Sequence, residues 1–242
     1  MMRILIIIPA YNEADTIADV VASLKAHVPN GAILVIDDGS ADATAAIVRS
    51  MDGVNLIRLP FNMGIGSAVQ TGFKYAVREG FDVAIQCDAD GQHPAHQIPR
   101  LLSRLEQGDC DLVIGSRFVA DSEYTPSVFR RIGKSMLSRL VDTVVGGGIT
   151  DTTSGFRAAN RKALKVFAHH YPDDYPEAEA LVILHKHGLR AVEVPVDMNP
   201  RQGGRTSITP LRAVYYMVKV GLAIFIDVFR KYTARPGDTD AT

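Results

Sequence analysis

Short aliphatic runs alternate with helical stretches along the first half of the chain, and this alternation limits the fold more than any other feature. The aliphatic runs carry few polar residues, which is typical of parallel strands buried on both faces. Between them, apolar residues recur at helical spacing. The expected strands are residues 3–8, 32–36, 54–59, 83–85 and 111–115. Strands that alternate with helices predict an α/β fold, with a Rossmann-like, mostly parallel sheet and helices on both faces.

Local signals predict where several elements begin and end. Pro9 is expected to end the first strand, because proline lacks the N–H that a sheet requires. Asn12 and Ser40 are expected to cap the helices that follow the first and second strands. Residues 150–161 are expected to form a polar loop that enters a short helix. The other expected elements are helices at 64–78, 94–107, 127–145 and 175–187, and a strand at 189–196.

The composition argues against several classes of protein. The 242 residues are 47% hydrophobic and 22% charged, which is ordinary for a soluble domain with a core. A net charge of −1 predicts no overall attraction to nucleic acid. Cys87 and Cys110 lack the close spacing of a metal site and indicate a reducing compartment. No run approaches the roughly 18 uncharged apolar residues that a membrane span requires.

Polar residues follow the expected strands rather than the helices. Tyr11 and Glu13 follow the first strand, and Asp38 follows the second. Arg117 follows the strand at 111–115. In open parallel sheets, ligands bind at the carboxyl ends of the strands, so these side chains are expected to share one site. For Asp38 the alternative is a turn that leads into a helix cap.

The stretch QCDADGQHP contains the strongest chemical signal in the chain. Asp88, Asp90 and Gln92 are two residues apart, so in an extended segment their side chains project to one side. Two carboxylates and an amide oxygen suit Mg²⁺ or Mn²⁺, and the remaining ligands of such an ion usually include substrate phosphates. The stretch therefore predicts a metal that also binds a diphosphate. The alternative is an ordinary turn, because Asp-Gly pairs favour turns.

Two glycine-containing loops carry weaker signals. Gly64 and Gly66 open a helix, which suggests a phosphate-binding loop, although close packing of the helix explains glycines there equally well. Arg201 and Arg205 flank a glycine pair in the stretch PRQGGRTSI. That arrangement fits a loop that closes on an anion better than a plain connection.

The stretch from 211 to 231 is expected to form a helix that is apolar on most of its surface. Arg212, Lys219 and Arg230 share one narrow face. A narrow charged stripe on an apolar helix suits a helix that lies in the membrane plane or docks on a membrane partner. A core helix is the alternative. The polar residues from 233 to 242 are expected to be disordered.

Seven runs in order resemble glycosyltransferase family 2, which has the GT-A fold. They are IPAYNE, DDGS, NMGIGSAVQTGF, DADGQHP, GSRF, TSGFR and RQGGRTSI. The chain is most similar to the dolichyl-phosphate mannose synthase-like branch, which includes bacterial polyprenyl-phosphate glycosyltransferases. The stretch YPEAE, at 175–179, departs from the sequence typical of mannose synthases.

The resemblance implies roles for particular residues. Those implied to hold the nucleotide of the donor are Pro9, Ala10, Tyr11, Glu13, Asp38 and Gly64. Asp88, Asp90 and Gln92 would hold Mg²⁺ or Mn²⁺. Arg117, Arg131 and Ser135 resemble the site for the acceptor phosphate, and Arg201 and Ser207 lie in the loop that would close over the diphosphate.

The resemblance also implies a reaction and a location. A hexose would pass, with inversion, from a UDP- or GDP-sugar to a polyprenyl phosphate such as a dolichyl or undecaprenyl phosphate. The expected organisation is a catalytic domain at 1–210, a docking helix at 211–232 and a tail at 233–242. The expected location is the cytoplasm, with the protein peripheral at the cytoplasmic face of the membrane, on its surface or on a small membrane protein.

Other functions stay open at this point. Transfer to a sugar hydroxyl of a growing polysaccharide would need a base, for which Glu177, Glu179 and Asp151 are the candidates. A capping role at a helix start is the alternative for the two glutamates. A protein of another class would bind a nucleotide-sugar without catalysis or act as a scaffold. A nucleotidyltransferase would need a glycine- and lysine-rich loop after the first strand, and PAYNE is not such a loop.

Overall fold

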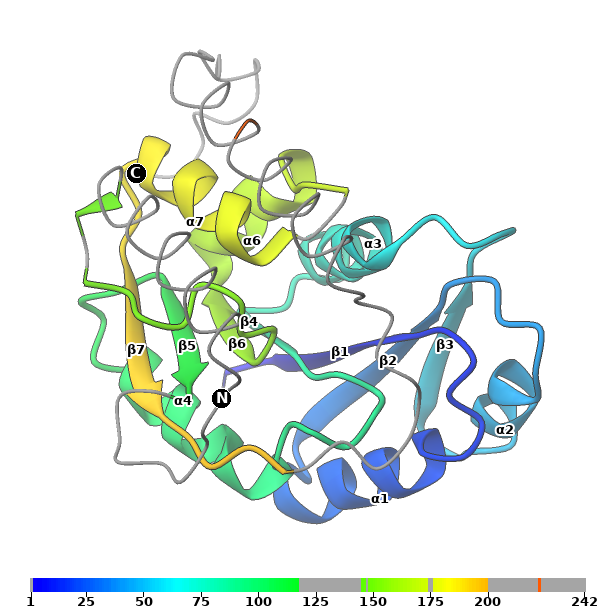
Figure 1. Ribbon diagram of the computed structural model, residues 1–242. Helices are drawn as coiled ribbons and strands as arrows, with labels where there is room; N and C mark the ends of the chain where they lie inside the picture. Colours follow the sequence, from blue (N-terminus) through cyan, green and yellow to red (C-terminus); the bar gives the residue numbers. More distant parts are fainter. Residues whose placement is uncertain (1, 118–144, 147, 174–175, 200–221, 223–242) are drawn as a thin grey trace, which may run out of the picture.

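The computed structural model describes residues 2–117, 145–146, 148–173, 176–199 and 222. Its centre is a seven-stranded sheet in the order β3-β2-β1-β4-β6-β5-β7 (Figure 1). Neighbouring strands are parallel except at β6, which runs antiparallel to both β4 and β5. The strands are β1 (Ile4–Ala10), β2 (Gly31–Asp37), β3 (Val54–Arg58), β4 (Val83–Gln86), β5 (Leu112–Ser116), β6 (Arg157–Asn160) and β7 (Ala191–Pro195).

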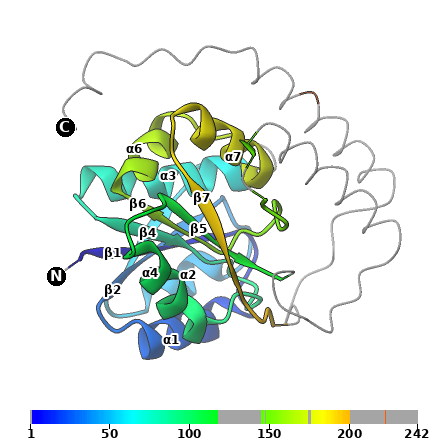
Figure 2. The same ribbon diagram turned by 90° about the vertical axis from the view of Figure 1, so that its left-hand side faces the viewer.

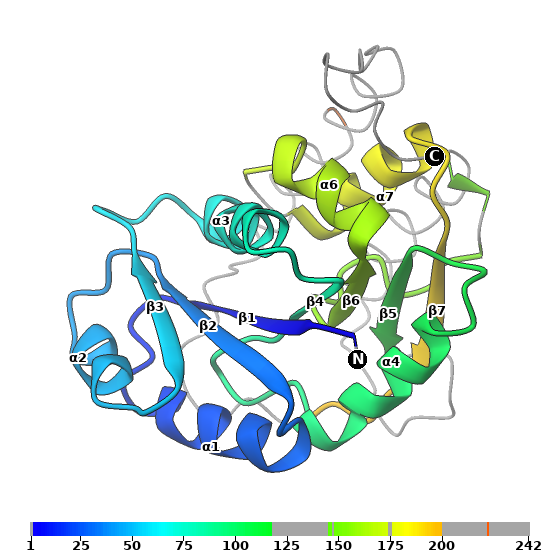
Figure 3. The same ribbon diagram turned by 180° about the vertical axis from the view of Figure 1, so that it is seen from behind.

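Helices cover both faces of the sheet, which confirms the predicted α/β fold (Figures 2 and 3). Helices α3, α6 and α7 pack on one face, and α1, α2 and α4 pack on the other. The helices are α1 (Ile17–His27), α2 (Thr44–Arg49), α3 (Ile65–Arg78), α4 (Ile98–Leu105), α6 (Arg161–His169) and α7 (Pro176–Lys186), with a 3₁₀ turn η1 (Ala95–Gln97).

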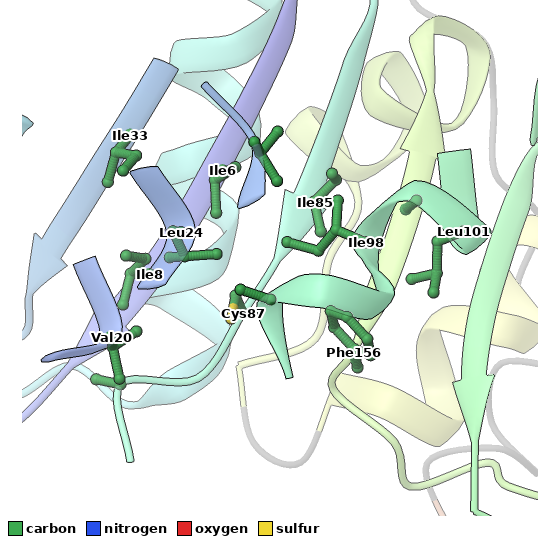
Figure 4. Close-up of a cluster of buried hydrophobic side chains, with 14 of the residues drawn as sticks. Ile6, Ile8, Val20, Leu24, Ile33, Ile85, Cys87, Ile98, Leu101 and Phe156 are labelled. Atoms are coloured by element: carbon green, nitrogen blue, oxygen red, sulfur yellow. The ribbon is translucent and has the colours of Figure 1, made fainter. Parts of the chain in front are cut away.

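The aliphatic run of β1 serves two cores at once. Leu5 and Ile7 belong to the core under α3, α6 and α7, whereas Ile6 and Ile8 belong to the core under α1 and α4. Figure 4 shows Ile6 and Ile8 among the side chains of that second core. Because successive side chains of a strand point to opposite faces, a strand covered on both sides must be apolar throughout.

The prediction that Pro9 ends the first strand is wrong by two residues. β1 continues to Ala10, with Pro9 opposite Ile36 and Ala10 opposite Asp37. On its other side β1 pairs with β4 only as far as Ile7, opposite Gln86. The backbone nitrogen of Pro9 faces the β4 side of the strand, where the pairing has already ended. Its missing N–H therefore breaks no hydrogen bond of the sheet.

The predicted capping roles of Asn12 and Ser40 are also wrong. The first helix follows Thr16 and the second follows Ala43, in both cases without a side-chain cap. Asn12 instead joins the two loops: its N–H donates to Ser40 Oγ at 2.9 Å, and its Oδ1 accepts from Ala41 N at 2.9 Å. These loops leave neighbouring strands at the same edge of the sheet, so each side chain reaches the adjacent loop before its own helix.

Strand β6 was not predicted. Residues 150–161 were expected to lead from a loop straight into a helix, but Arg157–Asn160 pairs with both β4 and β5 before α6 begins. The run RAAN has no β-branched residue, so its composition gives no strand signal. Asn160 then caps α6, its Oδ1 accepting from Lys162 N and Ala163 N at 3.0 Å each.

Within the residues that the structure describes, no helix is long and apolar enough to cross a membrane. The predicted helix at 211–232 and tail at 233–242 lie outside those residues, apart from Leu222. The predicted helix at 127–145 lies outside them except at Val145.

Candidate active site

The carboxyl ends of the parallel strands form one edge of the sheet, which we term the carboxyl edge. Asp38 follows β2 there, the stretch 87–93 follows β4, and Arg117 follows β5. Because β6 is antiparallel, it starts at this same edge, with Arg157 opposite Gln86. The loop that precedes β6 therefore joins the predicted site, which the sequence did not indicate.

The stretch after β4 forms a tight loop around Asp88 and Asp90. Asp90 is buried, and its Oδ1 accepts from Gln92 N at 3.0 Å. Gly91 has φ 77°, so a turn is present as well as the two carboxylates. Asn199, which follows β7, fixes the loop from outside through its N–H to Gln92 O at 2.9 Å. The turn and the metal interpretations are therefore compatible.

His93 contacts both the backbone and the carboxylate of Asp88. Its Nδ1 accepts from Asp88 N at 2.9 Å, so the ring carries its proton on Nε2, which lies 3.6 Å from Asp88 Oδ2. The ring stacks on Phe156, with the centroids 5.0 Å apart. The side chain of Asp88 remains 34% exposed, so its carboxylate is fixed but still accessible to a ligand.

These residues fit a divalent cation that takes part of its coordination from a substrate. Among the described residues, no group of three or more His, Cys, Asp or Glu side chains could hold a metal ion. Two carboxylates and the amide of Gln92 suit Mg²⁺ or Mn²⁺ only when further oxygen ligands are added. The metal assignment of these three residues stays a prediction.

Asp38 organises the loop in front of α3. Its Oδ1 accepts from Met63 N at 2.7 Å and its Oδ2 accepts from Gly64 N at 2.9 Å. Burial raises the pKa of Asp38, and these two hydrogen bonds oppose that shift. Beside it at the same edge, Tyr11 is 46% exposed. Nucleotide binding by Pro9, Ala10, Tyr11, Glu13 and Asp38 stays a prediction.

The glycines at the start of α3 have separate structural reasons. Gly64 has φ 92°, a conformation that favours glycine. Gly66 N donates to Asp173 O at 3.1 Å, and a Cβ at position 66 would lie 2.0 Å from Pro172 O. Close packing therefore explains Gly66, and phosphate binding by Gly64 stays a prediction.

Replacing Gly66 by alanine is expected to destabilise the protein by about 3 kcal/mol, because its methyl group would overlap two backbone carbonyl oxygens. Thermal or denaturant unfolding measures this. Gly108→Ala is the control: nothing lies within 4 Å of its Cβ position, so only the strain of its positive φ of 78°, which Gly66 does not have, is expected to cost about 1 kcal/mol. Equal losses in the two variants would contradict the packing explanation.

Arg117 is held by a buried carboxylate. Its Nε donates to Asp151 Oδ2 at 2.8 Å and its Nη2 donates to Asp151 Oδ1 at 2.9 Å. Asp151 is fully buried, and Glu193 on β7 fixes its loop by accepting from Thr150 N at 2.9 Å and Asp151 N at 2.6 Å. A buried carboxylate with both oxygens on one guanidinium is a poor general base, so this geometry disfavours Asp151 in that role.

The chain matches the sequence profile of the family described as Glycosyl transferase family 2 over residues 5–167. It belongs to that family. It is 31% identical over 230 residues to polyprenol monophosphomannose synthase of Mycolicibacterium smegmatis, covering 90% of this chain and 85% of the relative. It is 33% identical over 212 residues to UDP-N-acetylglucosamine–dolichyl-phosphate N-acetylglucosaminyltransferase of Methanococcus voltae, covering 80% and 84%.

Solved structures support the fold. Glucosyl-3-phosphoglycerate synthase from Mycobacterium tuberculosis, in complex with Mn²⁺, UDP and phosphoglyceric acid, superposes with a TM-score of 0.70 at 21% identity. The match covers 93% of this chain and 78% of that one. This structure confirms the predicted GT-A fold, and the family match and the two named relatives confirm the predicted glycosyltransferase class.

Four of the predicted site residues of this family 2 glycosyltransferase lie outside the described part of the chain. They are Arg131, Ser135, Arg201 and Ser207. Arg205, the second arginine of the expected anion loop, also lies outside it. Their assignment to the acceptor phosphate and the diphosphate stays a prediction.

A polar cluster near Asp88 contains Glu177, which the sequence interpretation named as a possible base, and Gln86, Arg157 and Tyr171, which it missed. Gln86 and Arg157 are buried. Glu177, at the start of α7, and Tyr171, two residues after the end of α6, lie near Arg157. Burial raises the pKa of Glu177, the charge of Arg157 opposes this, and the charge of Asp88 adds to it. A glutamine at the end of an aliphatic strand was the available signal.

Proposed function

We propose that this family 2 glycosyltransferase transfers a hexose, with inversion and with the help of a divalent cation, from a nucleotide-sugar to a polyprenyl phosphate. One observation carries the proposal: the carboxylates of Asp88 and Asp90 and the guanidinium of Arg117, which Asp151 holds, all follow strands at the carboxyl edge. Two relatives at 31% and 33% identity are named for polyprenol or dolichyl-phosphate products and substrates, which supports the acceptor class.

On the donor side, Asp88, Asp90 and Gln92 would hold Mg²⁺ or Mn²⁺. The cation, when bound, would stabilise the charge that develops on the leaving diphosphate. The protein's contribution is to fix the ligands: Gln92 N holds Asp90, and His93 holds the backbone of Asp88. Arg201 and Ser207 would close over the diphosphate. The Mn²⁺ bound to the M. tuberculosis synthase supports the choice of a divalent cation for this fold.

On the acceptor side, Arg117, Arg131 and Ser135 would bind the phosphate. A phosphate monoester has a second pKa of about 6, so it is mostly dianionic at neutral pH and needs no general base. Arg117 is held by two hydrogen bonds to Asp151, which limits the directions from which an oxygen can approach. Such positioning would orient one phosphate oxygen for in-line attack.

A lipid acceptor requires contact with a membrane surface. We propose that residues 1–210 form the catalytic domain, and that the stretch 211–232 docks on the cytoplasmic face of the membrane or on a small membrane protein. The tail at 233–242 would take no part in catalysis.

A second candidate, transfer to a sugar hydroxyl, is favoured by one observation. Burial raises the pKa of Glu177, the charge of Asp88 raises it further, and the charge of Arg117 lowers it. A carboxyl group with a perturbed pKa therefore lies near the proposed cation site. Groups of this kind often serve as general bases. Glu179, on the same first turn of α7, is the other candidate.

Replacing Glu177 by glutamine is expected to stabilise the protein at neutral pH but not in acid. When folding raises the pKa of a carboxyl group, the folded protein loses stability as the pH rises above the unfolded-state pKa of that group. Glutamine does not ionise, so the variant has no such loss. The melting temperature of the variant relative to the wild type should therefore increase from pH 4 to pH 8. A constant difference over that range would contradict the cause assigned to the pKa shift.

The acceptor can be tested with three compounds and the wild-type protein. A polyprenyl phosphate, the matching polyprenol and an oligosaccharide are offered in parallel with labelled donor and Mn²⁺. The proposal predicts product on the phosphate alone, and Glu177→Gln should retain most of that activity. Product on the oligosaccharide, lost in Glu177→Gln or Glu179→Gln and recovered at high pH, would establish the second candidate instead.

A further inference from the structure

Glu193 holds two successive backbone amides of the loop before β6. Its Oε2 accepts from Thr150 N at 2.9 Å and from Thr150 Oγ1 at 2.8 Å, and its Oε1 accepts from Asp151 N at 2.6 Å. Hydrogen bonds to an ionised acceptor are roughly twice as strong as those between neutral groups. The carboxylate of Glu193 therefore fixes the peptide units that carry Asp151.

The sheet in turn fixes the backbone of Glu193. This residue lies on β7, which runs beside β5 and parallel to it, and it stands opposite Ile114 (Figure 1). Arg117 follows Ser116, the last residue of β5. Residues on strands hold a site more precisely than residues on loops. A rigid strand next to β5 thus supports the loop that contacts Arg117.

Asp151 transmits this support to Arg117. Besides the two guanidinium contacts, its Oδ2 accepts from Arg117 N at 3.2 Å, so one carboxylate holds both the backbone and the side chain of the arginine. Thr153 Oγ1 also accepts from Arg117 Nη2, at 3.2 Å. A chain of hydrogen bonds therefore runs from β7 to the arginine at the carboxyl edge.

The position of Glu193 on β7 does not by itself favour a carboxylate. Ala191, two residues earlier, packs in the core under α3, α6 and α7, and side chains two apart on a strand share a face. Glu193 is half-buried there, so part of its hydration is lost. The contacts with Thr150 and Asp151 offset that cost, and their effect is to place Arg117.

We propose that Glu193 is a positioning residue for sugar transfer, which holds Arg117 in the orientation that binds the acceptor phosphate. This inference rests on the proposed function, in which Arg117 contacts that phosphate. A guanidinium binds a phosphate best through two parallel N–H···O bonds, which a tilt of its plane would disrupt. An arginine that is already held also loses less conformational freedom when the phosphate binds. In this role Glu193 contacts neither substrate and acts through Asp151.

Three substitutions separate the reach of the side chain from its charge. Glu193→Leu removes the hydrogen bonds to Thr150 and Asp151, and Glu193→Asp keeps the charge but shortens the side chain by one methylene. Both are expected to lower kcat/KM for polyprenyl phosphate at least about tenfold, because small misplacements of a binding group have effects of this size or larger. Glu193→Gln can still accept from Asp151 N and donate to Thr150 Oγ1, so it should stay within about threefold of the wild type.

Donor binding distinguishes positioning from a general loss of structure. The affinities for UDP and GDP with Mn²⁺, measured by calorimetry, and the KM for the nucleotide-sugar should stay at wild-type values in all three variants. Melting curves show whether each variant is folded at the assay temperature. Glu106→Leu, at an exposed position after α4, is the control for the loss of a carboxylate.

A double-mutant cycle tests whether Glu193 acts through Arg117. The Arg117→Met, Asp151→Asn variant removes the ion pair without leaving a buried charge. Adding Glu193→Leu to that variant should lower kcat/KM for the acceptor no further. Additive losses would mean that Glu193 affects the reaction by another route.

Other results would also overturn the inference. Equal losses for donor and acceptor would make Glu193 a support of the fold alone, and wild-type acceptor kinetics in both Glu193→Leu and Glu193→Asp would remove it from the reaction. These results leave the proposed function intact, since the wild type still forms product. If the wild-type protein forms no product from polyprenyl phosphate, the proposed function itself fails, and this inference fails with it.

Discussion

The Asp90→Asn variant is expected to lose about a thousandfold or more in turnover while it remains folded. Asp90 is buried at the carboxyl edge, and its Oδ1 accepts from Gln92 N, a hydrogen bond that the asparagine Oδ1 can also accept. The change therefore removes the charge and preserves the loop. Under our proposal, that charge holds the cation that stabilises the leaving diphosphate, an effect that contributes several kcal/mol in the transition state.

Initial rates at saturating donor, together with a melting curve, measure this prediction. Asp52→Asn, at an exposed position in the turn before β3, is the matched control and should keep full activity. A second readout is Mn²⁺ affinity in the presence of UDP, which should fall in Asp90→Asn alone. An Asp90→Asn enzyme that turns over at the wild-type rate would remove Asp90 from the site.

The Arg117→Met variant is expected to lose both stability and acceptor use. Removing the guanidinium takes an ion-pair partner away from the fully buried carboxylate of Asp151, and breaking such a buried pair typically costs about 3–5 kcal/mol. Arg117 is also the proposed partner of the acceptor phosphate, so kcat/KM for the acceptor should fall about a hundredfold, which is about 2.7 kcal/mol. Denaturant unfolding and acceptor titration at fixed donor measure the two losses.

The double variant Arg117→Met, Asp151→Asn separates the two effects. It removes the buried charge together with its partner, so much of the stability should return. Acceptor kcat/KM should stay low, because the phosphate still lacks its arginine. Recovery of acceptor use along with stability would show that Arg117 acts only as a structural partner of Asp151.

The sequence was most informative where one physical cause acted alone. The β1 run is aliphatic because cores on both faces cover it, so its strand was predictable from composition. Strand β6 was not, because Arg157–Asn160 becomes a strand through pairing with β4 and β5 and not through its own propensity. The capping roles of Asn12 and Ser40 failed for the same kind of reason: each contacts a loop distant in sequence.

The candidate site, like the fold, was predictable from the sequence only in part. Asp38, Asp88 and Arg117 follow strands directly, so a rule about strand ends was enough to group them. The ion pair of Arg117 with Asp151 depends on the antiparallel entry of β6, which brings the loop at 151–155 to the carboxyl edge. Gln86 and Arg157 face each other only because of that pairing, and no local pattern in the sequence indicates it.

The central claim is metal-dependent transfer of a sugar to a polyprenyl phosphate, and product formation tests it most directly. Purified protein is incubated with a panel of UDP- and GDP-sugars, a short polyprenyl phosphate, and Mg²⁺ or Mn²⁺, with EDTA in parallel. Our account predicts a lipid-linked sugar from one donor, formed only when the cation is present. Release of sugar from the donor without a lipid product, or equal product in EDTA, would contradict it.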